Sequence, residues 1–392
     1  MLVAGAGAAV HADGFSAAGL AAERALAAAG TATADTVLVF AGSRHDHDEY
    51  AGVLRGVHQR LPGAVVAGCS ATGVLTGDEE LETASAVAVL VLAGDPTLPR
   101  PIVVRELRHD ARAAGGRLGR AAKEALRGDL GGAALAVLVD PGELDAADFI
   151  LGIAESAPGL LLTGAGASGG ARGSRVFVDD GAYADSCIGL LLPPALHPTF
   201  GMTQGCQGLS EPMTITAADG NLILEIDGRS PQEILRKMLA DPRNRALGPA
   251  MAEHLLAGIG DLISTGRSDY VVRPFAVTED DDRTLAVAEP VRAGQTIRFT
   301  LRDAIGARDD MKAMLDEQAD ARGDVAPPRF GVYFNCAGRG SALYGQPGLD
   351  PELIRRRFGK LPVVGIESSF EIAPACGRPR IHMFTGVLLL AG

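Results

Sequence analysis

Residues 61–73 read Leu-Pro-Gly-Ala-Val-Val-Ala-Gly-Cys-Ser-Ala-Thr-Gly, and this stretch decides the fold class. The run Val65–Ala67 is apolar at successive positions, which predicts a short strand covered by helices on at least one side. Gly68–Gly73 consists of small residues, which predicts a loop at the end of that strand. Strands of this kind recur along the chain with helical stretches between them, so the sequence predicts an α/β protein.

The alternation of strands and helices can be followed through the first half of the chain. Ser16 is a predicted N-cap and Gly30 stands just past a predicted helix end. The predicted strands are Thr36–Phe40, Val65–Ala67, Ala86–Leu92, Ile102–Glu106, Leu135–Val139, Gly159–Leu162, Arg175–Val178 and Ile188–Leu192. The predicted helices are Ala17–Ala29, Glu49–Gln59, Ala113–Leu126 and Ala146–Glu155.

An internal repeat is visible in three places. Each unit has a strand, a helix, a residue followed by proline, a second strand with a small-residue loop, and a closing strand. The first strands are Val37–Phe40, Leu135–Val139 and Phe330–Phe334, and the closing strands are Val87–Leu92, Ile188–Leu192 and Gly386–Leu390. Because α/β sheets bind ligands beyond the carboxyl ends of their strands, the three loops are candidate ligand sites. The repeat is short and degenerate, so chance similarity of α/β units is the alternative.

The middle of the chain changes character. Met213–Ala217 and Asn221–Ile226 predict a hairpin, and Ser230 followed by Pro231 predicts a helix start. Val271–Val277 with Thr284–Val287 predicts a second hairpin around the acidic run Glu279–Asp282, interpreted as a solvated loop rather than a Ca²⁺ site. We therefore expect two modules, residues 1–225 and 226–392, made of mixed β-sheets covered by helices. The repeated β-α-β units run through both, and the β-hairpins lie in the C-terminal module.

Composition limits the partners and the compartment. With 36 Lys and Arg against 48 Asp and Glu, the formal net charge is −12, which disfavours nucleic acid and anionic membranes as partners. We expect no signal peptide and no membrane span, because no apolar run approaches the ~20 residues that a spanning helix needs. The five cysteines have no C-x-x-C spacing, which is typical of a reducing compartment. The expected location is therefore the cytoplasm.

Some familiar motifs match by chance. Gly164–Gly169 fits both a dinucleotide fingerprint and, shifted by two residues, a nucleophile elbow, but each requires a helix to follow, whereas another strand is predicted here. His45–Glu49 is the string most like a metal site, with two His beside carboxylates. The alternative, which we favour, is that its carboxylates stabilise the N-terminus of the helix that follows.

Two of the small-residue loops carry the candidate binding chemistry. Gly68–Gly73 presents a thiol, two hydroxyls and free backbone amides, which could hold a carboxylate. In Asn335–Gly340, Arg339 could pair with a carboxylate and lower the pKa of the Cys336 thiol. Glu371 lies in a comparable loop, where it could neutralise Arg339 or bind an amino group. The alternative for these loops is plain turn formation and core packing.

Eight stretches of the chain together resemble one family, the FIST proteins, from about residue 36 to the end. Those that resemble the FIST N module are Val37–Ala41, Leu61-Pro62, Val66–Gly73 and Gly164–Gly170. Those that resemble the FIST C module are Tyr270–Phe275, Gly294–Asp303, Phe334–Gly340 and Gly365–Pro374. The order and spacing of these stretches carry the resemblance.

The resemblance implies a sensory protein that binds a small ligand, such as an amino acid, and passes that state to a signalling partner in trans. Some members resemble haem-based gas sensors, and eukaryotic relatives join an F-box to the same modules. This chain departs from the family at Phe370, where members tend to have Gly, so a narrower pocket is expected. The ligand-binding residues that the resemblance implies are Cys69, Ser70, Thr72, Ser168, Arg273, Asn335, Cys336, Arg339 and Glu371. Arg273 and Arg302 are weaker candidates, and both could instead be structural ion-pair partners.

We therefore expect a cleft between the two modules that binds a small polar metabolite, with no catalytic residue, metal or resident cofactor. Three alternatives stay open. The first is a thiol-dependent enzyme with Cys336 as nucleophile and His382 or His254 as base. The second is a haem sensor that uses one of the eight His as axial ligand. The third is a scaffold without a pocket that recruits other proteins.

Overall fold

The computed structural model describes residues 2–42, 47–82, 85–94, 101–169, 173–245, 254–261, 269–278, 284–323 and 325–392. The predicted acidic loop Glu279–Asp282 and the start of the His45–Glu49 string lie outside these residues. Within them, no helix is long and apolar enough to cross a membrane.

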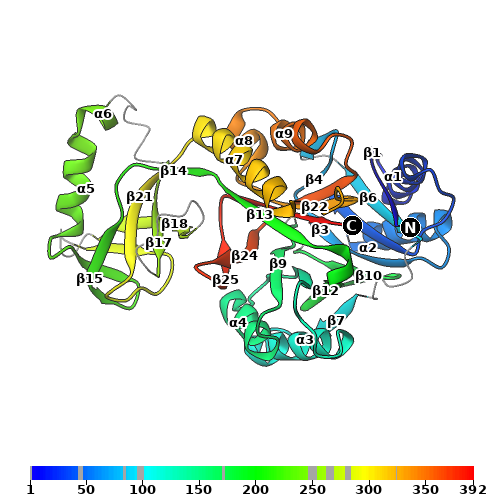
Figure 1. Cartoon of the computed structure of the whole chain (residues 1–392), viewed down its shortest axis with the longest axis horizontal. Coiled ribbons are helices and arrows are strands. Elements are labelled where there is room, and N and C mark those ends of the chain that lie inside the picture. The colour runs from blue at the N-terminus through cyan, green and yellow to red at the C-terminus, as the bar shows by residue number, and fades with distance from the viewer. Residues whose placement is uncertain are drawn as a thin grey trace.

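The described strands form three six-stranded sheets and one eight-stranded sheet (Figure 1). The first sheet has the order β1 (Val3–Val10), β6 (Ala86–Ala93), β2 (Thr36–Gly42), β3 (Val65–Ala71), β10 (Val176–Val178) and β11 (Gly181–Tyr183). The second has the order β7 (Ile102–Arg105), β12 (Ser186–Leu192), β8 (Ala134–Val139), β9 (Leu161–Gly166), β24 (Phe370–Ala375) and β25 (Arg378–His382). The third has the order β13 (Thr199–Gln204), β26 (Thr385–Ala391), β22 (Phe330–Cys336), β23 (Val363–Ser368), β4 (Gly73–Thr76) and β5 (Glu80–Glu82).

The three six-stranded sheets have the same construction, which confirms the predicted repeat. In each, two parallel strands lie side by side, the closing strand pairs antiparallel with the first of them, and a hairpin completes the sheet. The hairpin always comes from another unit: β10–β11 joins the first sheet, β24–β25 the second and β4–β5 the third. This exchange ties each unit to the other two.

The inner faces of these three sheets share one apolar core, and helices cover their outer faces. The helices are α1 (Gly14–Ala29) and α2 (His47–Arg60) on the first unit, α3 (Ala111–Ala125) and α4 (Ala146–Ser156) on the second, and α7 (Ala304–Arg322) and α9 (Leu349–Phe358) on the third. The parallel pair of each unit requires a glycine: a Cβ on Gly68, Gly164 or Gly365 would lie between 1.7 and 2.2 Å from a neighbouring backbone oxygen. The third unit lies in the predicted C-terminal module, yet its sheet packs on the same core as the first two.

The described residues between 206 and 302 form a separate layer at one end of the long axis (Figure 1), which we call the inserted subdomain. Its strands are β14 (Cys206–Gly208), β15 (Met213–Asp219), β16 (Leu222–Ile226), β17 (Leu255–Gly260), β18 (Val271–Arg273), β19 (Phe275–Val277), β20 (Leu285–Val287) and β21 (Thr296–Arg302). Its helices are α5 (Pro231–Ala240) and α6 (Pro242–Arg245). It follows β13 and precedes α7, so it interrupts the third unit, and it has a core of its own.

Several local predictions need correction. The single strand predicted for Val271–Val277 is two strands, because Pro274 lacks an N–H and breaks the run; β18 pairs with β17, whereas β19 pairs with β20. The first helix begins earlier than predicted, since Asp13 rather than Ser16 caps it by accepting a bond from the Ser16 N–H at 2.8 Å. The C-cap Gly30 is confirmed in the left-handed conformation at φ 66°.

Candidate functional site

The strand ends of the three units meet at one junction. The predicted loop Gly68–Gly73 is not a loop throughout, because β3 runs on to Ala71 and β4 begins at Gly73. Ser70 donates from Oγ to the carbonyl oxygen of Ser168 at 2.8 Å, and the Thr72 N–H donates to Ser168 Oγ at 2.7 Å. Ser168 Oγ in turn donates to the carbonyl oxygen of Glu367, at the end of β23. The structure therefore brings Ser70, Thr72 and Ser168 together, as their matching places in the repeat predict.

This junction is closed rather than hollow. Ser70 is fully buried and Ser168 is 7% exposed, and both hydroxyls are used in bonds between the units. Cys69 points into the shared core, where burial raises the pKa of its thiol well above the ordinary value. The cavity where the three inner faces meet, between Leu38, Leu138 and Phe334 among others, holds only about 10 Å³. A space of that size has room for one water at most.

Arg339 lies in a buried ion pair. Its Nε and Nη2 donate to the two carboxylate oxygens of Asp350 at 3.0 and 3.1 Å, and Nη2 also donates to the Tyr344 hydroxyl at 2.7 Å. Tyr333 and Tyr344 each donate to Asp350 at 2.9 Å. Since Arg339 is 1% exposed, the expectation that it faces an open hollow is corrected: its bidentate partner is a carboxylate of α9.

The Cys336 thiol is also buried, so the predicted low pKa is wrong. Burial raises its pKa to about 12, and the neighbouring Glu371 adds to the shift. Its sulfur accepts a hydrogen bond from the Phe384 N–H at 3.2 Å. Burial lowers the pKa of His382 to about 3, and that ring bonds the carbonyl oxygen of Ala373 at 3.1 Å. Burial therefore keeps the Cys336 thiol protonated at neutral pH, so it is not an activated nucleophile.

The carboxyl group of Glu371 accepts hydrogen bonds from two hydroxyl groups. Ser368 and Thr385 donate to its two oxygens, each at 2.7 Å, and the side chain is fully buried. Burial raises its pKa to about 7, and the two hydroxyls oppose the shift. Asn335, also fully buried, donates from Nδ2 to Glu80 at 3.0 Å. These candidates therefore lie in polar contacts inside the protein.

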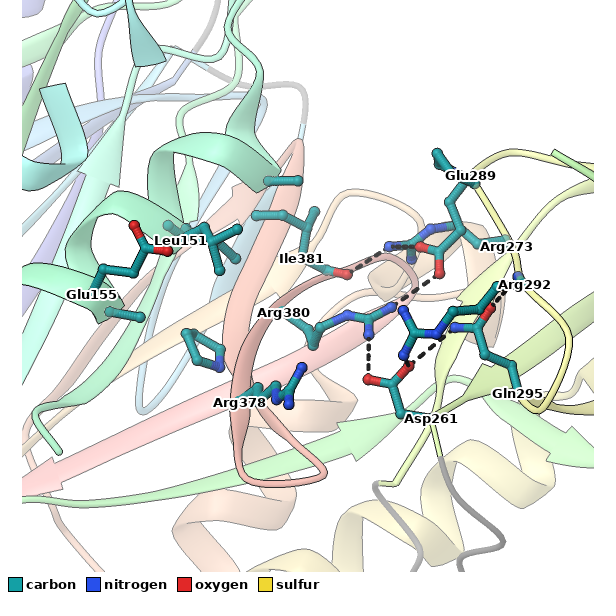
Figure 2. A pocket seen from close by; sticks show the side chains of 15 residues that line it. Leu151, Glu155, Asp261, Arg273, Glu289, Arg292, Gln295, Arg378, Arg380 and Ile381 are labelled. Atoms are coloured by element: carbon teal, nitrogen blue, oxygen red, sulfur yellow. Dashed lines mark hydrogen bonds and ion pairs between the residues drawn. The ribbon is translucent and has the colours of Figure 1, made fainter. Parts of the chain in front are cut away.

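A cavity of about 510 Å³ lies elsewhere, between α4, β25 and the inserted subdomain (Figure 2). We call it the interdomain cleft. Its lining residues are Ala147, Ile150, Leu151, Ala154, Glu155, Asp261, Arg273, Glu289, Pro290, Arg292, Gln295, Arg378, Pro379, Arg380 and Ile381. Its volume is within the range of pockets that bind small molecules.

One wall of the interdomain cleft is a network of arginines and carboxylates (Figure 2). Glu289 bridges Arg273 at 2.7 Å and Arg380 at 2.9 Å. Asp261 bridges Arg380 at 3.2 Å and Arg292 at 3.3 Å. Arg380 belongs to β25 of the second sheet, whereas both carboxylates belong to the inserted subdomain. The network therefore fastens the inserted subdomain to the three-unit core.

The opposite wall is largely apolar, and the carboxylate of Glu155, which also lines it, is paired with Arg112. Ile150, Leu151 and Ala154 come from α4, and Figure 2 shows Leu151 across the cleft from the arginines. Arg378 lines the cleft as an exposed residue, and it makes no ion pair with any residue that the structure describes. The cleft therefore combines an apolar wall with an excess of guanidinium groups, which suits a small molecule that carries a carboxylate.

Of the predicted ligand-binding residues, Arg273 lines the interdomain cleft. It is 7% exposed, and it also donates to the carbonyl oxygen of Ile381 at 2.9 Å. Arg302, the other weaker candidate, donates to the carbonyl oxygen of Gly338. Sequence reasoning missed Arg378 and Arg380, although two arginines on either side of Pro379 were a usable signal.

Comparisons with known proteins place the chain in a family. A model of the FIST N domain matches residues 35–229, and a model of the FIST C domain matches residues 231–374. The chain therefore belongs to the FIST family, whose domains are generally sensory and signal-transduction domains.

Similar proteins occur in mycobacteria. An uncharacterized protein of Mycobacterium tuberculosis is 29% identical over 363 residues, which cover 90% of each chain. An uncharacterized protein of Mycobacterium bovis is 30% identical over 370 residues, which cover 91% of this chain and 90% of the relative. Among solved structures, a cyanuric acid hydrolase from A. caulinodans is similar at 9% identity and a TM-score of 0.34. The match covers 100% of this chain and 99% of the hydrolase chain.

Proposed function

We propose that this FIST protein senses a small polar metabolite with a carboxylate, which binds in the interdomain cleft, and that it signals to a protein partner in trans. The observation that carries the proposal is the lining of the cleft. Leu151 and its neighbours on α4 lie within the FIST N match, whereas Asp261, Arg273 and Glu289 lie within the FIST C match. A ligand there contacts both domains at once.

The charges of the cleft define the ligand class. Arg378 is the guanidinium that a ligand carboxylate reaches without breaking an existing ion pair of the described residues, and Arg380 lies beside it. Asp261 and Glu289 supply carboxylates to an ammonium group, and the α4 wall packs against an apolar side chain. An amino acid or a short carboxylic acid meets all three requirements.

The same contacts couple binding to a change of pose. Arg380 holds the inserted subdomain through Asp261 and Glu289, so a ligand carboxylate that takes over Arg380 weakens the fastening. A ligand shifts a conformational equilibrium only as far as it binds one state better than the other. Because the three repeat units share one core, we propose that the inserted subdomain is the part that moves.

Thermal-shift screening of the full chain with amino acids and small carboxylic acids, followed by isothermal titration of the hits, tests the proposal. Leu151→Trp fills the cleft and is expected to weaken binding at least tenfold. Its matched control is Leu20→Trp, since Leu20 on α1 is 42% exposed against 43% for Leu151 and does not line the cleft. No hit with well-folded protein, or equal affinities for the two variants, would overturn the proposal.

A further inference from the structure

Three glutamates converge at the edge of the third sheet, away from the interdomain cleft. Glu80 and Glu82 belong to β5, and Glu367 lies near the end of β23. Each offers one carboxylate oxygen, and these three oxygens lie within 4.8 Å of one another. Glu80 and Glu367 are each only 7% exposed. No Lys or Arg of the described residues forms an ion pair with any of the three.

Such a cluster is costly without a counter-charge. The three carboxylates repel one another, and the burial of Glu80 and Glu367 adds to the cost of their charge. The backbone nonetheless positions the carboxylates. The Gly348 N–H donates to Glu80 and the Ser341 N–H donates to Glu82, each at 2.6 Å. These donors fix one oxygen of Glu80 and one oxygen of Glu82.

A second and independent observation comes from Asn335. Its side chain is fully buried, and Nδ2 donates to Glu80 Oε1 at 3.0 Å, so the amide faces the cluster. Its Oδ1 has no hydrogen-bond partner among the described residues. A buried amide oxygen without a partner is uncommon and costs free energy. Rotation of the amide by half a turn presents that oxygen to the cluster in place of the nitrogen.

The surroundings leave room for the carboxylates. A Cβ on Gly73 would lie 2.5 Å from the carboxylate of Glu367, and one on Gly340 would lie 2.1 Å from Glu82 Oε1. Asn335 and Glu367 are also register partners on the parallel strands β22 and β23. The four side chains thus come from β5, β22 and β23, and glycines stand where a larger residue would displace them.

We propose that Glu80, Glu82 and Glu367 bind one Ca²⁺ ion, with the amide oxygen of Asn335 as a further ligand. All donors are oxygens, which hard cations prefer over the nitrogen and sulfur ligands typical of zinc. Two Ca²⁺–oxygen bonds of about 2.4 Å allow ligand oxygens to lie up to about 4.8 Å apart, and the three oxygens lie within that limit. Mg²⁺ fits less well, because it keeps several waters and this site is buried.

The proposed ion links two repeat units. Glu80 and Glu82 stand on the hairpin that the first unit lends to the third sheet, whereas Asn335 and Glu367 belong to the third unit itself. A cation shared between them fastens the exchanged hairpin. Binding to the folded chain alone therefore raises thermal stability as the cation concentration rises. This role is independent of the interdomain cleft and of the proposed sensing.

The test uses the full chain, freed of metal with a chelator that is then removed. Isothermal titration with CaCl₂, MgCl₂, MnCl₂ and ZnCl₂ is combined with thermal unfolding in each salt. The expected result is one Ca²⁺ per chain and a Tm that rises with CaCl₂, with a smaller rise for MgCl₂. Glu82→Gln and Asn335→Leu are each expected to weaken Ca²⁺ binding at least tenfold, since each removes one ligand.

The matched control is Glu79→Gln, because Glu79 is the exposed neighbour of Glu80 and lies outside the cluster. It is expected to leave Ca²⁺ affinity unchanged. Circular dichroism checks that each variant folds, and Glu82→Gln decides the matter if Asn335→Leu does not fold, because Glu82 is only partly buried. No Ca²⁺ binding at millimolar concentration, or equal losses in Glu79→Gln and Glu82→Gln, would overturn the proposal.

Discussion

The buried pair of Arg339 and Asp350 gives a prediction whose size follows from its contacts. Removing one partner of a buried pair leaves a charge without compensation and costs about 3–5 kcal/mol. In Arg339→Met the Asp350 carboxylate keeps two hydroxyl donors, from Tyr333 and Tyr344 at 2.9 Å. We therefore expect a loss near the lower end, about 3 kcal/mol. In Asp350→Asn the guanidinium loses its counter-charge, so we expect a loss near the upper end, about 5 kcal/mol.

Urea unfolding at pH 7, followed by far-ultraviolet circular dichroism, measures both losses. The double variant Arg339→Met/Asp350→Asn is expected to lose less than the sum of the two, because the pair is removed together. Arg339→Met is also expected to bind a cleft ligand with unchanged affinity, whereas Arg378→Gln is expected to weaken it. A stability loss below about 1 kcal/mol in Arg339→Met, together with lost ligand binding, would refute the structural role.

Three further predictions concern Glu371, the cysteines and Gly68. The pKa of Glu371 is about 7 in the fold against an ordinary 4.5, so its contribution to stability is present at low pH and is lost as pH rises from about 4.5 to 7. Glu371→Gln is expected to remove this part of the pH dependence, about 3 kcal/mol in size, in unfolding measured across that range. Of the five cysteines, Cys376 alone is not buried. A maleimide at pH 7 is therefore expected to label Cys376 first in the native protein. Mass spectrometry that finds Cys336 labelled first would contradict this prediction. Gly68→Ala is expected to destabilise the fold by several kcal/mol in the same unfolding assay, because a Cβ would lie 1.7 Å from Val39 O. The matched control is Gly63→Ala, whose Cβ would have no atom within 4 Å. Its cost is the strain of an alanine at a φ of +82°.

The repeat was predictable because its physical requirements are local. Buried parallel strands need continuous apolar runs, and the close approach of each strand pair needs glycine at Gly68, Gly164 and Gly365. Both requirements leave a mark in the sequence at regular places. The helices between the strands showed the usual apolar spacing, and Gly30 marked the end of the first. The α/β class and the three units could therefore be read from residues alone.

The exchange of hairpins could not be predicted, since β10 and β11 have only three residues each and β10 pairs with β3, more than 100 positions away. The role of Arg339 was also beyond sequence reasoning. An arginine between glycines pairs equally well with a ligand or with a carboxylate of the chain, and only the fold places Asp350 beside it. The interdomain cleft is lined by residues from three distant parts of the chain: 147–155, six described residues between 261 and 295, and 378–381. No single stretch of sequence therefore predicts it.

The central claim is that the ligand binds in the interdomain cleft rather than at the loops of the strand-end junction. Hydrogen exchange of the full chain, with and without a metabolite that stabilises it, tests this claim most directly. Our account predicts slower exchange on ligand binding in α4 and in residues 378–381. Slower exchange confined to residues 68–73 and 335–340, with none in α4, would contradict it.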